Sequence, residues 1–132
     1  MVKEVSKKAI ELIKKMQQNE LTESVIYEEI AKFAKGEENK KTLLRLAAEE
    51  RAHYEIWKEY TGIEMKPQMG KILKYKFFAR VFGFTFTVKL MENGEEHAQD
   101  EYSLLFEEVE ESKNIMEQEN TMRCTIQSIP QF

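Results

Sequence analysis

Apolar residues recur every three or four positions along most of this 132-residue chain, which is the spacing of amphipathic α-helices. The pattern predicts four long helices, over residues 3–35, 38–60, 84–109 and from 111 onward, and a shorter aromatic segment over 69–82. Only five Gly and two Pro are present, which argues against an all-β chain with many tight turns. We therefore expect an all-α fold.

Three residues mark the expected helix ends. Gly36 is predicted to stop the first helix, Gly62 the second, and Pro130 the fourth. Helices joined partly by short loops favour an antiparallel four-helix bundle, with a long crossover between the second and third long helices that carries the aromatic segment. The predicted domain covers residues 1–126, and residues 127–132 form a frayed C-terminal tail.

Composition excludes several classes of protein. A net charge of −4 without a basic tail gives no reason to expect nucleic-acid binding. The lone Cys124 excludes an internal disulfide and any all-cysteine zinc or iron–sulfur site in one chain, and a reducing cytoplasm is the expected location. The stretch 72–91 is apolar but carries four basic residues, so it is not a plausible membrane span. Docking of the aromatic segment on a membrane surface is an alternative that we rank below a structural crossover.

Four glutamates fall inside the apolar stripes rather than on the charged faces. They are Glu20, Glu50, Glu95 and Glu119, one from each long helix. A buried carboxylate without compensation costs several kcal/mol, and the stripes contain no Lys or Arg to pair with these four. A divalent metal cluster would neutralise them and use their oxygens as ligands.

His53 follows Glu50 by three residues, so both side chains project from one face of a helix. Glu-x-x-His is the motif that di-iron bundles use together with glutamates from facing helices. Carboxylate and imidazole donors suit iron or manganese. The chain also contains an internal echo, because Tyr27 follows Glu20 by seven residues and Tyr102 follows Glu95 by seven.

Three runs of sequence carry a resemblance to a known family. Residues 19–27 (NELTESVIY) and 48–62 (AEERAHYEIWKEYTG) resemble the rubrerythrin branch of the ferritin-like superfamily. Residues 78–99 (FARVFGFTFTVKLMENGEEHAQ) resemble the rubrerythrin-like domains fused to membrane transporters of the vacuolar-iron-transporter type. The resemblance covers about residues 17–119 and implies a non-haem di-iron site that reacts with peroxide or dioxygen.

The resemblance also implies roles for individual residues. Glu20 and Glu95 would be terminal ligands, Glu50 and Glu119 would bridge, and His53 would hold one of two iron ions, with manganese as a possible substitute. Tyr27 and Tyr102 would donate hydrogen bonds to the carboxylates from outside the ligand set. Glu92, one turn before Glu95, is a lower-ranked extra ligand.

The chain departs from the family pattern at one ligand position. Met122 stands where the second Glu-x-x-His would place its histidine, and a thioether is a poor ligand for iron among carboxylates. The cysteines of a rubredoxin-type centre are missing, so the electrons would come from an external donor.

Two hypotheses remain open beside a peroxidase or ferroxidase that serves oxidative-stress defence or iron handling. One is an iron- or manganese-binding sensor or regulatory module without turnover, and the other is a metal-free helical bundle. We also expect a homodimer. If the fourth helix does not form, two chains would pair their helices to complete the bundle core, and the aromatic segment and Trp57 would suit such an interface.

Overall fold

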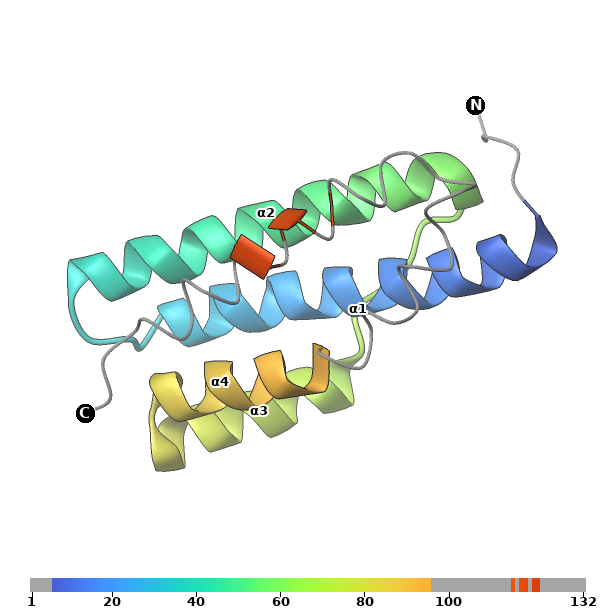
Figure 1. The fold of residues 1–132 in the computed structure, drawn as a ribbon. Coiled ribbons are helices and arrows are strands. Elements are labelled where there is room, and N and C mark those ends of the chain that lie inside the picture. The colour runs from blue at the N-terminus through green and yellow to red at the C-terminus, as the bar shows by residue number, and fades with distance from the viewer. Residues whose placement is uncertain (1–5, 96–114, 116, 119, 122–132) are drawn as a thin grey trace.

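The computed structural model describes residues 6–95, 115, 117, 118, 120 and 121 (Figure 1). Every regular element in this part of the chain is a helix, in agreement with the all-α prediction. The four continuous helices are α1 (Lys7–Ala31), α2 (Glu37–Thr61), α3 (Met69–Phe82) and α4 (Phe84–Glu95). The aromatic segment predicted over 69–82 is α3, and α4 is the first part of the helix predicted over 84–109. None of the helices in the described ranges is long and apolar enough to cross a membrane.

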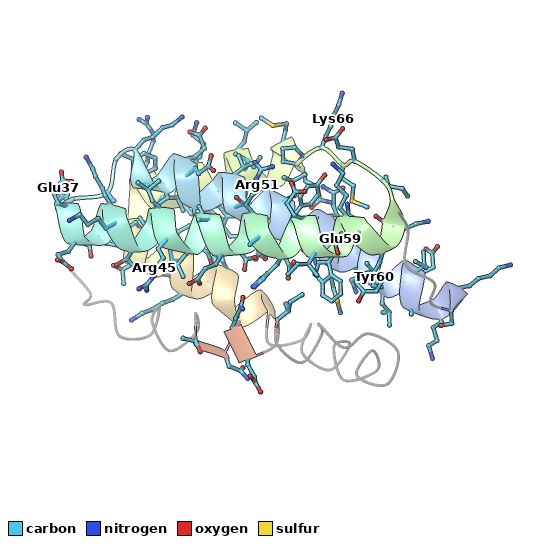
Figure 2. All side chains as sticks on the ribbon, turned by 90° about the horizontal axis from the view of Figure 1, so that it is seen from above. Glu37, Arg45, Arg51, Glu59, Tyr60 and Lys66 are labelled. Atoms are coloured by element: carbon cyan, nitrogen blue, oxygen red, sulfur yellow. The ribbon has the colours of Figure 1, made fainter. Side chains whose placement is uncertain are left out.

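The four helices form two antiparallel hairpins with α1 at the centre (Figure 1). Helix α2 packs along one side of α1, and α3 packs on another side. Helix α4 packs against α3. Several charged side chains of α2, among them Arg45, Arg51 and Glu59, are exposed to solvent (Figure 2). Buried polar residues of α1 and α2 lie where these two helices face each other.

Helix α1 is shorter at both ends than the predicted range 3–35. It begins at Lys7 because Ser6 is extended (φ −63°, ψ 160°) and its hydroxyl accepts a hydrogen bond from the Ala9 amide, at 3.2 Å. It ends at Ala31, so the expectation that Gly36 stops this helix is wrong. Gly36 instead precedes α2 as its N-cap, with φ 86° and ψ 141°, a conformation that only glycine adopts without strain.

Helix α2 ends as predicted. Gly62 is left-handed (φ 66°, ψ 13°), and its amide donates to the carbonyl of Lys58 at 2.8 Å.

The crossover from α2 to α3 is held against α1 by polar side chains. Gln17 Nε2 donates to the carbonyl of Ile63 at 2.7 Å, and Gln18 Nε2 donates to the carbonyl of Lys66 at 2.6 Å. One turn further, Thr22 Oγ1 accepts from the Gln68 amide at 3.1 Å, directly before α3. These bonds satisfy linker backbone groups that no regular element pairs. They therefore fix the path that the crossover takes to α3.

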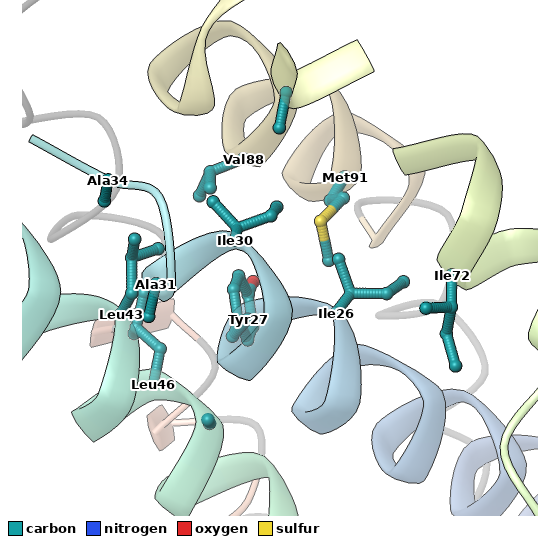
Figure 3. Packing of buried hydrophobic residues seen from close by; sticks show 12 residues of the cluster. Ile26, Tyr27, Ile30, Ala31, Ala34, Leu43, Leu46, Ile72, Val88 and Met91 are labelled. Atoms are coloured by element: carbon teal, nitrogen blue, oxygen red, sulfur yellow. The ribbon is translucent and has the colours of Figure 1, made fainter. Parts of the chain in front are cut away.

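Two apolar clusters hold the described helices together. The larger cluster joins the α1–α2 hairpin to the α3–α4 hairpin. Figure 3 shows Val88 and Met91 of α4 facing Ile30 and Ile26 of α1. The smaller lies at the other end of α1 and includes Ile13, Met16 and Trp57. Trp57 is 0% exposed within the chain, so it is not available for the dimer interface in which we expected it.

The described residues between 115 and 121 are helical and lie beside α2 (Figure 1). Ile115 belongs to the cluster of Trp57 and Tyr60, Gln118 contacts His53, and Thr121 lines a hollow with Glu49. As the residue number rises along this segment, the number of the α2 residue that it meets falls. The segment and α2 are therefore antiparallel. The described positions agree with the helix predicted from residue 111 onward, including the burial of Ile115.

Candidate metal centre

Glu20, Glu50 and His53 meet in the interface between α1 and α2. Glu20 comes from the middle of α1, and Glu50 and His53 come from adjacent turns of α2. Their exposed fractions are 3%, 0% and 0%, so the burial that their place in the apolar stripes predicts is confirmed. Nearby, the Ser24 hydroxyl donates to the carbonyl of Ala47 at 2.9 Å, a buried bond that ties α1 directly to α2.

The imidazole of His53 faces both carboxylates through the same nitrogen. Its Nδ1 lies 3.6 Å from Glu50 Oε1 and 3.8 Å from Glu20 Oε1. Both distances exceed the range of an N–H···O hydrogen bond. Two ligands that each lie about 2.1 Å from a shared ion are separated by roughly 3.0–3.6 Å. The distance from His53 to Glu50 is thus at the upper end of this range, and the distance from His53 to Glu20 is slightly beyond it.

Gln118, in the C-terminal segment, is a hydrogen-bond partner of the His53 ring. The second ring nitrogen, Nε2, is hydrogen-bonded to Gln118 Oε1. An amide oxygen only accepts hydrogen bonds, so Nε2 carries the proton in this arrangement. A neutral ring protonated at Nε2 then presents the Nδ1 lone pair to Glu20 and Glu50, as a metal ligand must.

The net charge of the three groups also favours a bound metal ion. Two ionised carboxylates and a neutral imidazole sum to −2, and protonating His53 would reduce this only to −1. Removing each of these charges from water costs several kcal/mol. One divalent cation among the three groups would bring their sum to zero, and their mixed oxygen and nitrogen donors match iron or manganese.

The three groups do not close a site on their own. Within the ranges that the structure describes, no group of three or more His, Cys, Asp or Glu side chains is arranged to hold a metal ion. The donor chemistry therefore fits a metal, whereas a complete ligand set needs further groups. Glu92 and Glu95 belong to α4, but the structure does not describe their side chains. Glu119 and Met122 lie outside the described residues. Their predicted places in the ligand set stay predictions.

Tyr27 lies two turns along α1 from Glu20 and is 1% exposed. It belongs to the apolar cluster of Ile26, Ile30 and Leu46, as Figure 3 shows. This surrounding accounts for the residue as part of the core, and its predicted role as a hydrogen-bond donor stays a prediction. Tyr102, the second predicted tyrosine, lies outside the described residues.

Sequence reasoning missed two polar residues near this interface. Gln118 is not among the predicted site residues, although it lies three residues after the buried Ile115. Glu23 is not among the glutamates predicted to be buried, yet it is only 9% exposed. Burial of Tyr75 in α3 raises the pKa of that residue, and the charge of Glu23 raises it further.

Comparison with known proteins adds no identity: no family model, no curated protein and no solved structure matches this chain.

Proposed function

We propose that this protein is a non-haem di-iron protein of the ferritin-like type that oxidises Fe²⁺ with peroxide or dioxygen. The observation that carries the proposal is the buried meeting of Glu20, Glu50 and the Nδ1 atom of His53 between two facing helices. Glutamate from one helix facing a Glu-x-x-His motif on the next is half of the ligand pattern of such bundles.

In this proposal each described residue has a defined task. Glu20 and Glu50 supply carboxylate oxygens, and His53 supplies Nδ1. Gln118 keeps the proton on Nε2 and so holds the lone pair toward the carboxylates. Bound iron would supply the electrons that reduce the oxidant. The apolar packing around the site, in which His53 is 0% exposed, keeps bulk water away from these groups.

The second half of the ligand set comes from the C-terminal half of the chain. On the family resemblance, Glu95 and Glu119 complete it, and Met122 leaves one iron without an imidazole. The antiparallel course of the described residues 115–121 along α2 supports this assignment, since it brings that segment to His53.

The test is an anaerobic titration of the protein with Fe²⁺, followed by addition of hydrogen peroxide. We expect two irons bound per chain and a rapid rise in near-ultraviolet absorbance after the oxidant. Glu50→Gln should remove most of the binding and the absorbance rise. Glu55→Gln is the matched control, because Glu55 is exposed on the same helix and should leave both unchanged.

Failure to bind iron, or equal behaviour of the two variants, would contradict the proposal.

A second function, a metal-dependent sensor without turnover, is favoured by one observation, the methionine at position 122. A site with one imidazole would bind Fe²⁺ or Mn²⁺ reversibly and oxidise iron slowly. Binding that is fully reversed by chelator, with no absorbance rise after peroxide, would select this function over the first.

A further inference from the structure

Helices α3 and α4 expose a row of large apolar side chains. On α3 the row recurs every four residues, and Leu73 and Phe77 are each 60% exposed. On α4, Phe86 is 48% and Leu90 37% exposed. The complete set, which we call the hairpin face, is Met69, Leu73, Phe77, Val81, Phe82, Phe86 and Leu90. Contiguous exposed apolar surface of this kind marks an interaction site.

The two helices contribute to one continuous face. The rings of Phe82, at the end of α3, and Phe86, in the first turn of α4, lie 5.2 Å apart. The ring centroids of Phe82 and Phe78 lie 6.2 Å apart, and those of Phe78 and Phe77 lie 6.0 Å apart, so ring contacts connect Phe82 to the row on α3. Ile72 and Ala79 occupy the opposite side of α3 and are buried against α1. The hairpin face is therefore the side of α3 that the rest of the described fold leaves uncovered.

Charge is strongly segregated along the chain at this face. Residues 69–91 contain five of the 20 Lys and Arg and none of the 24 Asp and Glu, so this segment carries +5 while the remainder carries −9. Lys74 and Arg80 are exposed on α3. Helical spacing places Lys74 at one border of the apolar row and Arg80 among its residues, and the guanidinium carbon of Arg80 lies 5.4 Å from the ring centroid of Phe33. An apolar stripe bordered by basic residues is the pattern of helices that lie on a membrane surface.

We propose that the α3–α4 hairpin docks on an anionic lipid membrane, with the hairpin face entering the boundary between headgroups and acyl chains. The bordering Lys and Arg side chains would contact lipid phosphates while their methylene stems cover apolar surface. A second copy of the chain is a poorer occupant, because a symmetric contact would place two +5 segments against each other. The proposal does not depend on metal binding.

Both hairpin helices would lie in the plane of the membrane. They are 14 and 12 residues long, α3 carries four basic residues and no acidic one, and no described helix is suited to span a bilayer. On this arrangement α1 separates α2 from the lipid, which leaves the exposed charged side of α2 in water (Figure 1).

The test is co-sedimentation of the full chain with vesicles of equal parts phosphatidylglycerol and phosphatidylcholine, and with vesicles of phosphatidylcholine alone. We expect binding to the anionic vesicles that weakens as salt is raised, and little binding to the neutral ones. Leu73→Ser should weaken binding about tenfold, since it removes one inserted apolar side chain. Leu44→Ser is the matched control, because Leu44 is 51% exposed on α2 and should have no effect.

A second pair of variants tests the charge. Lys74→Gln with Arg80→Gln should weaken binding by at least about tenfold, at roughly fivefold per base. Lys41→Gln with Arg45→Gln removes the same charge from the exposed surface of α2 and should leave vesicle binding within about twofold of the parent.

Three results would overturn the proposal: no vesicle binding, equal binding to neutral vesicles, or equal losses in both charge pairs. A dimer in sedimentation equilibrium that Leu73→Ser dissociates, without vesicle binding, would instead identify a second copy as the occupant.

Discussion

The α1–α2 hairpin buries charged groups, whereas the α3–α4 hairpin exposes apolar ones. The first encloses Glu20, Glu50 and His53 in its interface, and the second presents Leu73 and Phe77 to solvent. The glycines directly before the second helix of each hairpin are nevertheless alike, since Gly36 (φ 86°, ψ 141°) and Gly83 (φ 92°, ψ 158°) have nearly the same backbone conformation. The hairpins therefore differ in what their side chains contact, and each departs from the usual burial pattern where we propose a function.

The largest expected effect compares one aromatic side chain from each hairpin. Trp57→Ala should lower the free energy of unfolding by about 3–5 kcal/mol, because Trp57 is 0% exposed and its removal leaves a cavity. Phe77→Ala should change it by less than about 1 kcal/mol, because that side chain is 60% exposed. Urea denaturation followed by circular dichroism measures both. Similar losses would mean that Phe77 is covered by part of the chain or by a partner.

The second largest effect is the different response of the two hairpins to metal. Mn²⁺ at about 100 times its dissociation constant should stabilise the folded protein by about 2.7 kcal/mol, and chelator should abolish this gain. Hydrogen exchange should slow in α1 and α2, which hold the proposed ligands, and less in α3. Unchanged melting with and without chelator would instead favour a metal-free bundle.

A glycine substitution tests the turn of the first hairpin. Gly36→Ala should destabilise the protein by about 2 kcal/mol, because the positive φ of Gly36 strains any residue with a Cβ atom. Gly70→Ala, in the first turn of α3, should be neutral or slightly stabilising, since a Cβ atom there meets open space. Urea midpoints compare the two variants, and a neutral Gly36→Ala would show that the turn readily adopts another conformation.

The smallest effect concerns the ion pair that links the hairpins. Glu29 contacts Lys32 at 3.0 Å and Lys76 of α3 at 3.5 Å, and chiefly its hydrogen bond to Lys32 lowers the pKa of Glu29 below 4.5. A lowered pKa stabilises the fold above the unfolded-state value, and this contribution disappears as pH falls through the folded-state value. Glu29→Gln should therefore cost about 0.5 kcal/mol at neutral pH and nothing in acid. Thermal melts over that pH range measure the difference.

Much of the fold and part of the candidate centre follow from the sequence. Periodicity predicts the helices, and the placement of Glu20 and Glu50 in apolar stripes predicts their burial, because 3.6 residues per turn assign each position to a face. Helix ends are less well determined. The first helix stops four residues before its predicted end because the turn before Gly36 takes up those residues.

Contacts between distant segments were decided only by the tertiary structure. Gln118 is 65 residues from His53, and no local pattern predicts that its amide meets that ring. The apolar residues of α3 occupy more than one side of the helix, so periodicity cannot say which side is buried. Packing on α1 decides this by covering Ile72 and Ala79 and leaving Leu73 and Phe77 outside. Local spacing thus determined each helix and its candidate ligands, whereas packing between helices determined which groups meet and which surface remains open.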